Sequence, residues 1–237
     1  MESADTDLLI RSGKGETVVD YYAPYRKALS QSQMEVNAVW LRNYLQNRGW
    51  SLNAIAAALG NWQSECTLNP NRPQRADFPN SSGGGFGLPQ WTPWKKKYGA
   101  WCQGQGIQIQ NNDYNPAGRF EPQIEYHDYE CRYGLNGKAT WYNNKGYHYK
   151  WDQWKTSLDS PDTLAIAYYW QYERSGAQAP GSRPQNALRW YQYLSGQPFT
   201  PITSGRYSPF PGMQRGFSIG SLRFLYIWLL LMILSRR

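Results

Sequence analysis

Two stretches of the sequence decide the fold: SLNAIAAALGNWQSECTLNP at residues 51–70 and GGGFGLPQWTPW at residues 83–94. In the first stretch, apolar side chains recur at helical spacing behind Ser51, a residue type that suits the N-cap. These side chains are Ile55, Leu59 and Trp62. The spacing predicts an amphipathic helix over about residues 52–66.

One acidic side chain lies beside the packed face of this predicted helix. Glu65 follows Trp62 by three residues, so the two side chains share a face. A carboxylate held against an indole is partly desolvated, and desolvation favours its protonated form. Glu65 is therefore the candidate general acid, the group that protonates a leaving oxygen.

Four motifs follow one another along the chain: GNWQSECTLNP at 60–70, GFGLPQWTPW at 85–94, AIAYYWQYERSGAQAP at 165–180 and NALRWYQYL at 186–194. Their order and separations resemble those of the phage tail lysozymes, within the lysozyme-like superfamily of phage muramidases, goose-type lysozymes and lytic transglycosylases. The resemblance covers roughly residues 36–195. It implies a mainly α, α+β lysozyme-like domain with a small loop or β-hairpin region.

The substrate-binding candidates come from the second motif, where residues 87–91 resemble the family's Gly-Leu-x-Gln-Trp element. The resemblance implies that Gln90 lines a sugar cleft, and its amide can both donate to and accept from sugar hydroxyls. The Trp91 ring can stack on a sugar face, and Gly87 ends a glycine run that lets backbone approach a substrate closely. Pro89 occupies the variable position (x) of this element and, as a proline, has no backbone N–H to donate there.

The resemblance implies a peptidoglycan-degrading glycosidase that cleaves between N-acetylmuramic acid and N-acetylglucosamine, with Glu65 as general acid. Glycoside hydrolysis usually uses two carboxyl groups. Asp77, in the loop before the glycine run, is the candidate for the second, and Asp113 is another. Some superfamily members work with a single Glu and form an anhydro product. A muramidase (lysozyme) and a lytic transglycosylase therefore both stay open.

Two other classes of protein also stay open. A non-catalytic wall-binding or tail structural protein would use the twelve Trp and nineteen Tyr to hold sugar. A cysteine amidase or peptidase would need a thiolate beside a histidine. The candidates are Cys66 or Cys102 with His127 or His148. For Cys66, Cys102 and Cys131, one disulfide with one free thiol stays open, but we favour three buried thiols, since phage proteins are made in a reducing compartment. No pair of cysteines has metal-ligand spacing, and we expect no metal and no cofactor.

The net charge of +8 implies attraction to polyanions. Nucleic acid is disfavoured because the basic residues are dispersed, apart from Lys95 to Lys97, and no zinc-finger, RNP or homeodomain-like pattern occurs. Bacterial peptidoglycan fits both the charge and the motifs. We expect a protein of the virion tail, or one made in the host cell, that acts at the bacterial cell wall.

The 237 residues divide by composition into four predicted segments: a polar leader at 1–32, the catalytic domain at 33–195, a Pro/Gly-rich linker at 196–216 and an apolar C-terminal helix at 217–237. The leader lacks the pattern of a secretory signal peptide. The uninterrupted apolar run of the last segment is eleven residues long, whereas a bilayer span needs about 20. Membrane insertion, packing in the phage tail assembly and an interfacial helix are the alternatives for it.

Outside the two deciding stretches, hydrophobic periodicity predicts four more helices: about Gln33–Arg48, Arg119–Tyr133, Ser160–Arg174 and Asn186–Leu194. Residues 136–160 are rich in aromatic residues, Asn, Gly and Lys and predict a loop. The acidic residues of the second of these helices, Glu125, Asp128 and Glu130, are expected to be solvated or paired. Glu173 is expected to be a scaffold feature.

Overall fold

The computed structural model describes residues 9–10, 21–134, 138–173 and 179–197. Within them the fold is mainly helical, as predicted, with seven α-helices and one pair of two-residue strands. The apolar segment 217–237 and most of the predicted linker lie outside the described residues. Across the described ranges, no helix combines the length and the apolar character that a membrane crossing requires.

Helix α1 (Gln31–Gln46) begins two residues before its predicted start. The Ser30 hydroxyl accepts a hydrogen bond from the backbone amide of Gln33, and the Gln33 side chain accepts one from the backbone amide of Ser30. This capping box satisfies amides that a helix start leaves unpaired. Gly49, with φ of +79°, then turns the chain towards α2.

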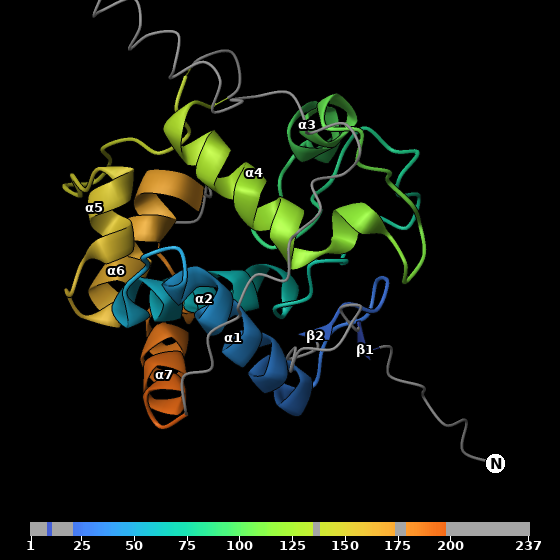
Figure 1. The fold of residues 1–237 in the computed structure, drawn as a ribbon. Coiled ribbons are helices and arrows are strands. Elements are labelled where there is room, and N and C mark those ends of the chain that lie inside the picture. The colour runs from blue at the N-terminus through green and yellow to red at the C-terminus, as the bar shows by residue number, and fades with distance from the viewer. Residues whose placement is uncertain (1–8, 11–20, 135–137, 174–178, 198–237) are drawn as a thin grey trace, which may run out of the picture. The chain divides into compact units, whose positions relative to one another are not determined.

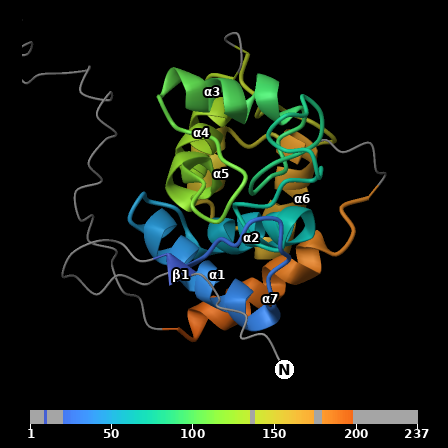
Figure 2. The same cartoon turned by 90° about the vertical axis from the view of Figure 1, so that its right-hand side faces the viewer.

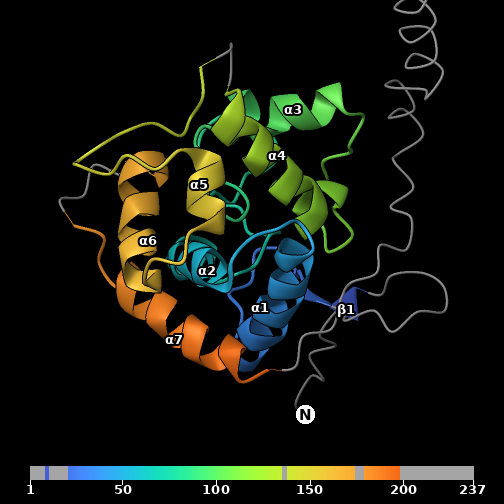
Figure 3. The same ribbon diagram turned by 60° about the vertical axis from the view of Figure 1, so that its left-hand side comes forward.

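Helix α2 (Leu52–Cys66) confirms the predicted bounds, and the Ser51 hydroxyl accepts from the Ala54 amide as expected of its N-cap. The helix is more than amphipathic, because every residue from Ala54 to Trp62 is buried. Figure 3 shows the reason: α2 is surrounded by α1, α5, α6 and α7. A helix that is apolar on nearly all sides belongs at the centre of a domain.

Two C-terminal elements cover α2, namely α6 (Pro161–Tyr168) and α7 (Arg183–Ser195). A Cβ atom added to Gly60 would lie 2.6 Å from the backbone oxygen of Arg183. Only glycine therefore lets α7 cross α2 so closely. The predicted helix up to Arg174 does not stay regular, since Tyr169–Glu173 form a π-helical turn.

Helix α4 (Phe120–Arg132) confirms the predicted helix to within one residue at each end. Helix α5 (Trp151–Thr156), by contrast, lies inside the region predicted as loop. Six residues are too few to show a helical period, and α5 is held by tertiary contacts instead. Its Trp154 is fully buried, with the indole stacked on that of Trp151. Figure 1 shows the position of α5 in the fold.

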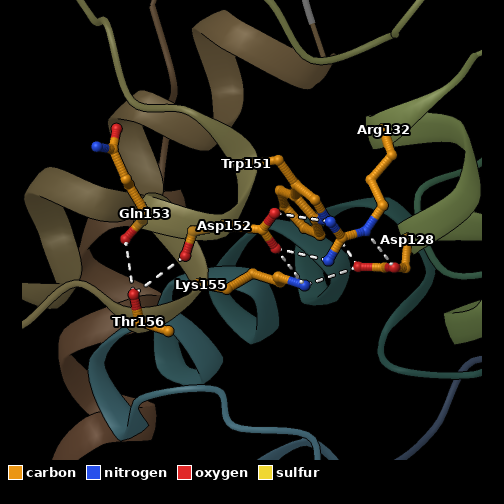
Figure 4. A network of polar contacts seen from close by, with 7 residues as sticks. All are labelled: Asp128, Arg132, Trp151, Asp152, Gln153, Lys155 and Thr156. Carbon is orange, nitrogen blue, oxygen red and sulfur yellow. Dashed lines mark hydrogen bonds and ion pairs between the residues drawn. The ribbon is translucent and has the colours of Figure 1, made fainter. Parts of the chain in front are cut away.

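A charged network joins α4 to α5, and Figure 4 shows it from close by. The guanidinium of Arg132 contacts both carboxylate oxygens of Asp152, at 2.6 Å each, and one oxygen of Asp128 at 2.7 Å. The ammonium of Lys155 contacts Asp128 at 2.8 Å and Asp152 at 3.1 Å. Each carboxylate of this joint therefore has two cationic partners.

The region between α2 and α4 contains α3 (Tyr98–Gly104) and two 3₁₀ turns, Trp94–Lys96 and Pro116–Gly118. In Figure 2, α3 and α4 lie on the opposite side of the drawing from α1 and α7. The small loop or β-hairpin region that the resemblance implies is mostly loop here, with one isolated antiparallel bridge between Pro73 and Phe86.

The strands lie elsewhere, with β1 (Leu9–Ile10) antiparallel to β2 (Tyr21–Tyr22) and Leu9 paired with Tyr22. Chain beyond β2 belongs to the core, since Ala23 and Leu29 are buried. The packed body therefore includes residues that precede position 33.

Candidate active site

A cleft of about 570 Å³ collects side chains from distant parts of the chain. It is bordered by α2, by the loop after it, by the end of α4 and by the π-helical turn. Its acidic, amide and aromatic residues include Glu65, Gln90, Trp91, Glu130, Tyr172 and Glu173. Its basic residues include Arg26, Arg72 and Lys97. The cleft is thus polar, charged and open to a large substrate.

Glu65 lies in the last turn of α2, which ends at Thr67 in the left-handed conformation, with φ of +54°. The Glu65 side chain keeps 22% of its surface exposed and pairs with the guanidinium of Arg183. The close crossing at Gly60 places Arg183 there. The sequence predicts an apolar setting at Trp62, whereas the structure gives Glu65 a cation as its direct partner.

Gln90 is one of the residues that line the cleft, and its φ is +50°. Its side-chain amide donates to the backbone oxygens of Arg72 and Gly87, both at 2.9 Å. These bonds hold two parts of the loop together. Gln90 therefore shapes the wall of the cleft with its amide NH₂ group already in use.

Trp91 borders the cleft but is only 2% exposed. Its indole stacks on the Tyr98 ring with centroids 4.8 Å apart. The indole nitrogen donates to Glu130 Oε2 at 2.7 Å and to the Tyr172 hydroxyl at 2.9 Å. The main contacts of Trp91 are thus with acidic and aromatic neighbours inside the protein.

Gly87 is buried behind the cleft rather than among its lining residues. With φ of +83°, a Cβ atom here would lie 2.8 Å from both Gln123 Oε1 and a carbon of the Trp91 ring. Gln123 is a buried amide of α4 that the sequence did not single out. Its oxygen accepts from the Leu88 amide and its nitrogen donates to Pro70 and Ala117.

The two aspartates predicted as second carboxylates do not meet Glu65. Asp77 is exposed outside the cleft, and a hydrogen bond from Arg75 lowers its pKa. Asp113 accepts from the backbone amide of Tyr25 at 2.6 Å and is not a lining residue either. The carboxyl groups that share the cleft with Glu65 are those of Glu130 and Glu173.

Glu130 is a satisfied buried carboxyl group. It is 1% exposed, and its Oε2 accepts from the Trp91 indole and from the Tyr172 hydroxyl, both at 2.7 Å. The sequence expected it to be solvated or paired. It is neither solvated nor in an ion pair within the described chain, because two neutral donors stabilise it.

Glu173 differs from Glu130 in its hydrogen bonding. Its Oε1 is buried without a hydrogen-bond partner among the described residues. Burial raises the pKa of Glu173 well above its usual range, and the carboxylates of Glu65 and Glu130 raise it further. The charges of Arg183 and Lys97 act in the opposite direction. Glu173 thus favours its neutral form.

The sequence profile of phage tail lysozymes matches residues 36–194, a range that contains every acidic residue of the cleft. The chain belongs to the phage tail lysozyme family. Morphogenesis protein 1 of Bacillus phage B103 is similar to it, with 33% identity over 174 residues. The match covers 73% of this chain and 43% of that protein, so the chain spans less than half of its relative.

In this member of the phage tail lysozyme family the cysteines are free and buried, as predicted. Burial raises the pKa of all three thiols, that of Cys102 to about 12. Burial also lowers the pKa of His127 to about 3, and its Nε2 lies 2.7 Å from the Tyr168 hydroxyl. A cysteine nucleophile requires a thiolate, which these surroundings disfavour.

Proposed function

We propose that the chain is a peptidoglycan-degrading glycosidase that cleaves between N-acetylmuramic acid and N-acetylglucosamine, with Glu65 as general acid. The supporting observation is that Glu65 and the Gln90–Trp91 pair, which come from separate motifs, border one cleft. The partly exposed Glu65 side chain can reach a bound glycosidic oxygen, and polar lining suits a sugar polymer. The proposed catalytic unit is residues 33–195 with the N-terminal residues that pack on it.

The second carboxyl group that glycoside hydrolysis usually requires has candidates both inside and outside the cleft. Asp77 was singled out in the sequence, but Glu130 and Glu173 are the carboxyl groups that line the cleft with Glu65. A hydrolase uses a second group to activate water or to form a covalent intermediate. A lytic transglycosylase closes an anhydro ring with the substrate's own hydroxyl. Masses of the released glycans separate the two, because the anhydro product lacks one water.

The test of the proposal is the Glu65→Gln variant, which keeps the shape of the side chain and removes its proton. We expect wall-lysis activity to fall by roughly 10²–10⁴-fold, the usual contribution of a general acid. The matched control is Glu35→Gln. Glu35 lies on α1 outside the cleft, where it accepts from the Gln31 side chain, and its loss should leave activity unchanged.

Release of reducing ends, or of anhydro products, from purified peptidoglycan is the measurement, alongside circular dichroism to verify the fold. Near-native activity of the Glu65→Gln variant would remove Glu65 from its role. Inactivity of the wild-type chain on all wall preparations would remove the enzymatic function itself.

The similarity to Morphogenesis protein 1 of Bacillus phage B103 favours a second role, in virion assembly. We infer that the chain acts as part of the phage tail and meets the bacterial cell wall from there. Binding of the chain to intact walls without any release of glycan ends would favour an assembly or wall-binding role alone.

For residues 217–237, the apolar sequence supports a proposed contact with membrane or with the tail assembly. Deletion of these residues tests it by liposome binding and by incorporation into particles. Unchanged behaviour in both assays would remove the proposal.

A further inference from the structure

The π-helical turn after α6 brings a second carboxyl group into the cleft of Glu65. In a regular α-helix each turn holds 3.6 residues, and a π turn inserts an extra residue, often at functional sites. This turn ends at Glu173, which borders the same cleft as Glu65 although 108 positions separate them in the sequence. Glu65 lies on α2 and Glu173 lies in the π-helical turn, so only the tertiary fold brings the two carboxyl groups to one cleft.

The hydrogen bonds of the two groups are unequal. Glu65 has the guanidinium of Arg183 as a direct partner. The Oε1 atom of Glu173 has no partner among the described residues. A buried carboxylate without donors is unfavourable, whereas a neutral carboxylic acid loses far less on leaving water. The proton of this part of the cleft is therefore held best by Glu173.

The charges around Glu173 agree with this assignment. The groups that face it come from four different parts of the fold and are Glu65 on α2, Glu130 on α4, Arg183 on α7 and Lys97 before α3. Arg26 and Arg72 also line the cleft, so the cleft as a whole does not lack cations. The carboxylates of Glu65 and Glu130 nevertheless oppose the ionisation of Glu173, because like charges held close together cannot all ionise.

We propose that Glu173 is a positioning residue that stores the catalytic proton as a neutral acid beside an ionised Glu65, and that it passes this proton to Glu65 when substrate fills the cleft. This inference rests on the proposed function, in which Glu65 is the general acid. It gives Glu173 a role through Glu65 rather than through contact with the sugar.

The transfer balances within the cleft. The O–H bond of Glu173 breaks, an O–H bond forms on Glu65, and Glu173 becomes the carboxylate. The positive charge of Arg183, which also acts on Glu173, then compensates the new carboxylate instead of the old one. Two carboxyl groups that exchange a proton titrate as a pair, so the pH dependence belongs to both.

The test is the pH profile of kcat/KM for wild type and Glu173→Gln. The variant has no stored proton, so Glu65 must take one from solvent. The positive charge of Arg183 disfavours that protonation of Glu65. We expect activity at pH 7 to fall about tenfold or more, and the alkaline limb to move to lower pH by about one unit. Glu173→Asp retains a carboxyl group and should restore the position of the limb in part.

A purely structural role gives a different result: activity falls by the same factor at every pH and the limb does not move. That outcome, or an unchanged profile in a folded Glu173→Gln variant, would overturn the proposal. Glu35→Gln serves again as the control for a lost surface charge.

Infrared difference spectroscopy tests the stored proton without any substrate. We expect wild type at pH 7 to show the C=O stretch of a protonated carboxyl group that is missing in Glu173→Gln. Its absence from wild type would refute the stored proton even if Glu65→Gln is inactive. Its presence beside a fully active Glu65→Gln variant would instead reject the role of Glu65.

Discussion

Two clusters of charge, one at the joint between α4 and α5 and one in the cleft, use the same residue types to opposite effect. At the joint, burial alone would raise the pKa of Asp128, but hydrogen bonds from Arg132, Lys155 and Trp151 lower it to about 2. In the cleft, burial raises the pKa of Glu173, and its Oε1 has no donor in the described chain. The number of donors decides which carboxyl group keeps a proton.

This difference assigns the clusters different roles. The joint is balanced, with two carboxylates and two cations in mutual contact (Figure 4), and it fixes how α5 sits on α4. The cleft instead contains a buried carboxyl group, that of Glu173, whose Oε1 has no donor in the described chain, which is unfavourable for stability but suits the transfer of a proton. Substitutions at the joint should therefore lower the stability of the fold, and substitutions of the carboxyl groups in the cleft should lower wall-lysis activity.

The largest expected effect on stability comes from Asp128→Ala. The change removes an acceptor from three donors and leaves the ammonium of Lys155, whose side chain is 10% exposed, with only Asp152. We expect a loss of about 2–3 kcal/mol. For a chain of this size that corresponds to roughly 5–10 °C in Tm. Activity per folded molecule should stay near that of wild type.

The control is Asp77→Ala, which removes an exposed carboxylate that forms an ion pair with Arg75. Its thermal unfolding should match wild type, and so should its wall-lysis activity if Asp77 is not the second carboxylate. A large drop in Tm for Asp77→Ala, or none for Asp128→Ala, would contradict the contrast between the joint and an ordinary surface pair.

The pH dependence of stability should have opposite signs at the two clusters. Asp128 has a depressed pKa in the folded state, so its contribution is present above pH 3.8 and is lost as pH falls towards 2. Because its side chain is 37% exposed, solvent screening reduces this contribution to about 1 kcal/mol. The difference in the free energy of unfolding between wild type and Asp128→Asn should therefore shrink as pH falls from 3.8 towards 2.

Glu173 has a raised pKa in the folded state, so the folded protein keeps a proton that the unfolded chain loses above pH 4.5. The contribution of Glu173 to the free energy of unfolding is therefore fully present below pH 4.5 and decreases as pH rises. Glu173→Gln should therefore gain stability relative to wild type between pH 5 and 8. Urea unfolding at stepped pH measures both slopes, and parallel slopes for the two variants would contradict the assignment.

The smallest expected effect is that of a thiol-blocking reagent. Burial of all three cysteines should leave the native protein unlabelled and its activity unchanged. Mass spectrometry counts the labelled thiols, with urea-unfolded protein as the positive control. Rapid labelling that abolishes wall lysis would revive the cysteine amidase or peptidase alternative.

Local sequence patterns predicted the elements that carry strong local signals. The N-cap at Ser51 and the apolar spacing behind it predicted α2 with its observed bounds. The helix predicted from about Gln33 begins two residues earlier, at Gln31, where Ser30 caps it. The motif around Gln90 was expected at a cleft because it resembles the family's Gly-Leu-x-Gln-Trp element, and Gln90 and Trp91 are both lining residues of the cleft. Helix α5 was not predicted, because its six residues show no helical period and it is stabilised by the packing of Trp151 and Trp154 against other elements.

The site was predictable only in part, for a related reason. The sequence pointed to Glu65, which lies in the cleft, but its neighbour Trp62 donates to the Tyr168 hydroxyl while Arg183 contacts the carboxylate. Arg183 is more than a hundred positions away in the sequence. Its approach depends on the missing side chain of Gly60, a contact that no local pattern encodes.

By itself, the sequence determined the helices with clear caps and periodicity, the family, and the two motifs that border the cleft. Only the tertiary structure decided which carboxyl groups share that cleft, that Gly87 serves packing, and that Glu173 Oε1 has no donor among the residues that the structure describes. The physical reason is range: capping and amphipathic spacing act within a few residues, whereas desolvation and charge pairing depend on whatever the fold brings alongside.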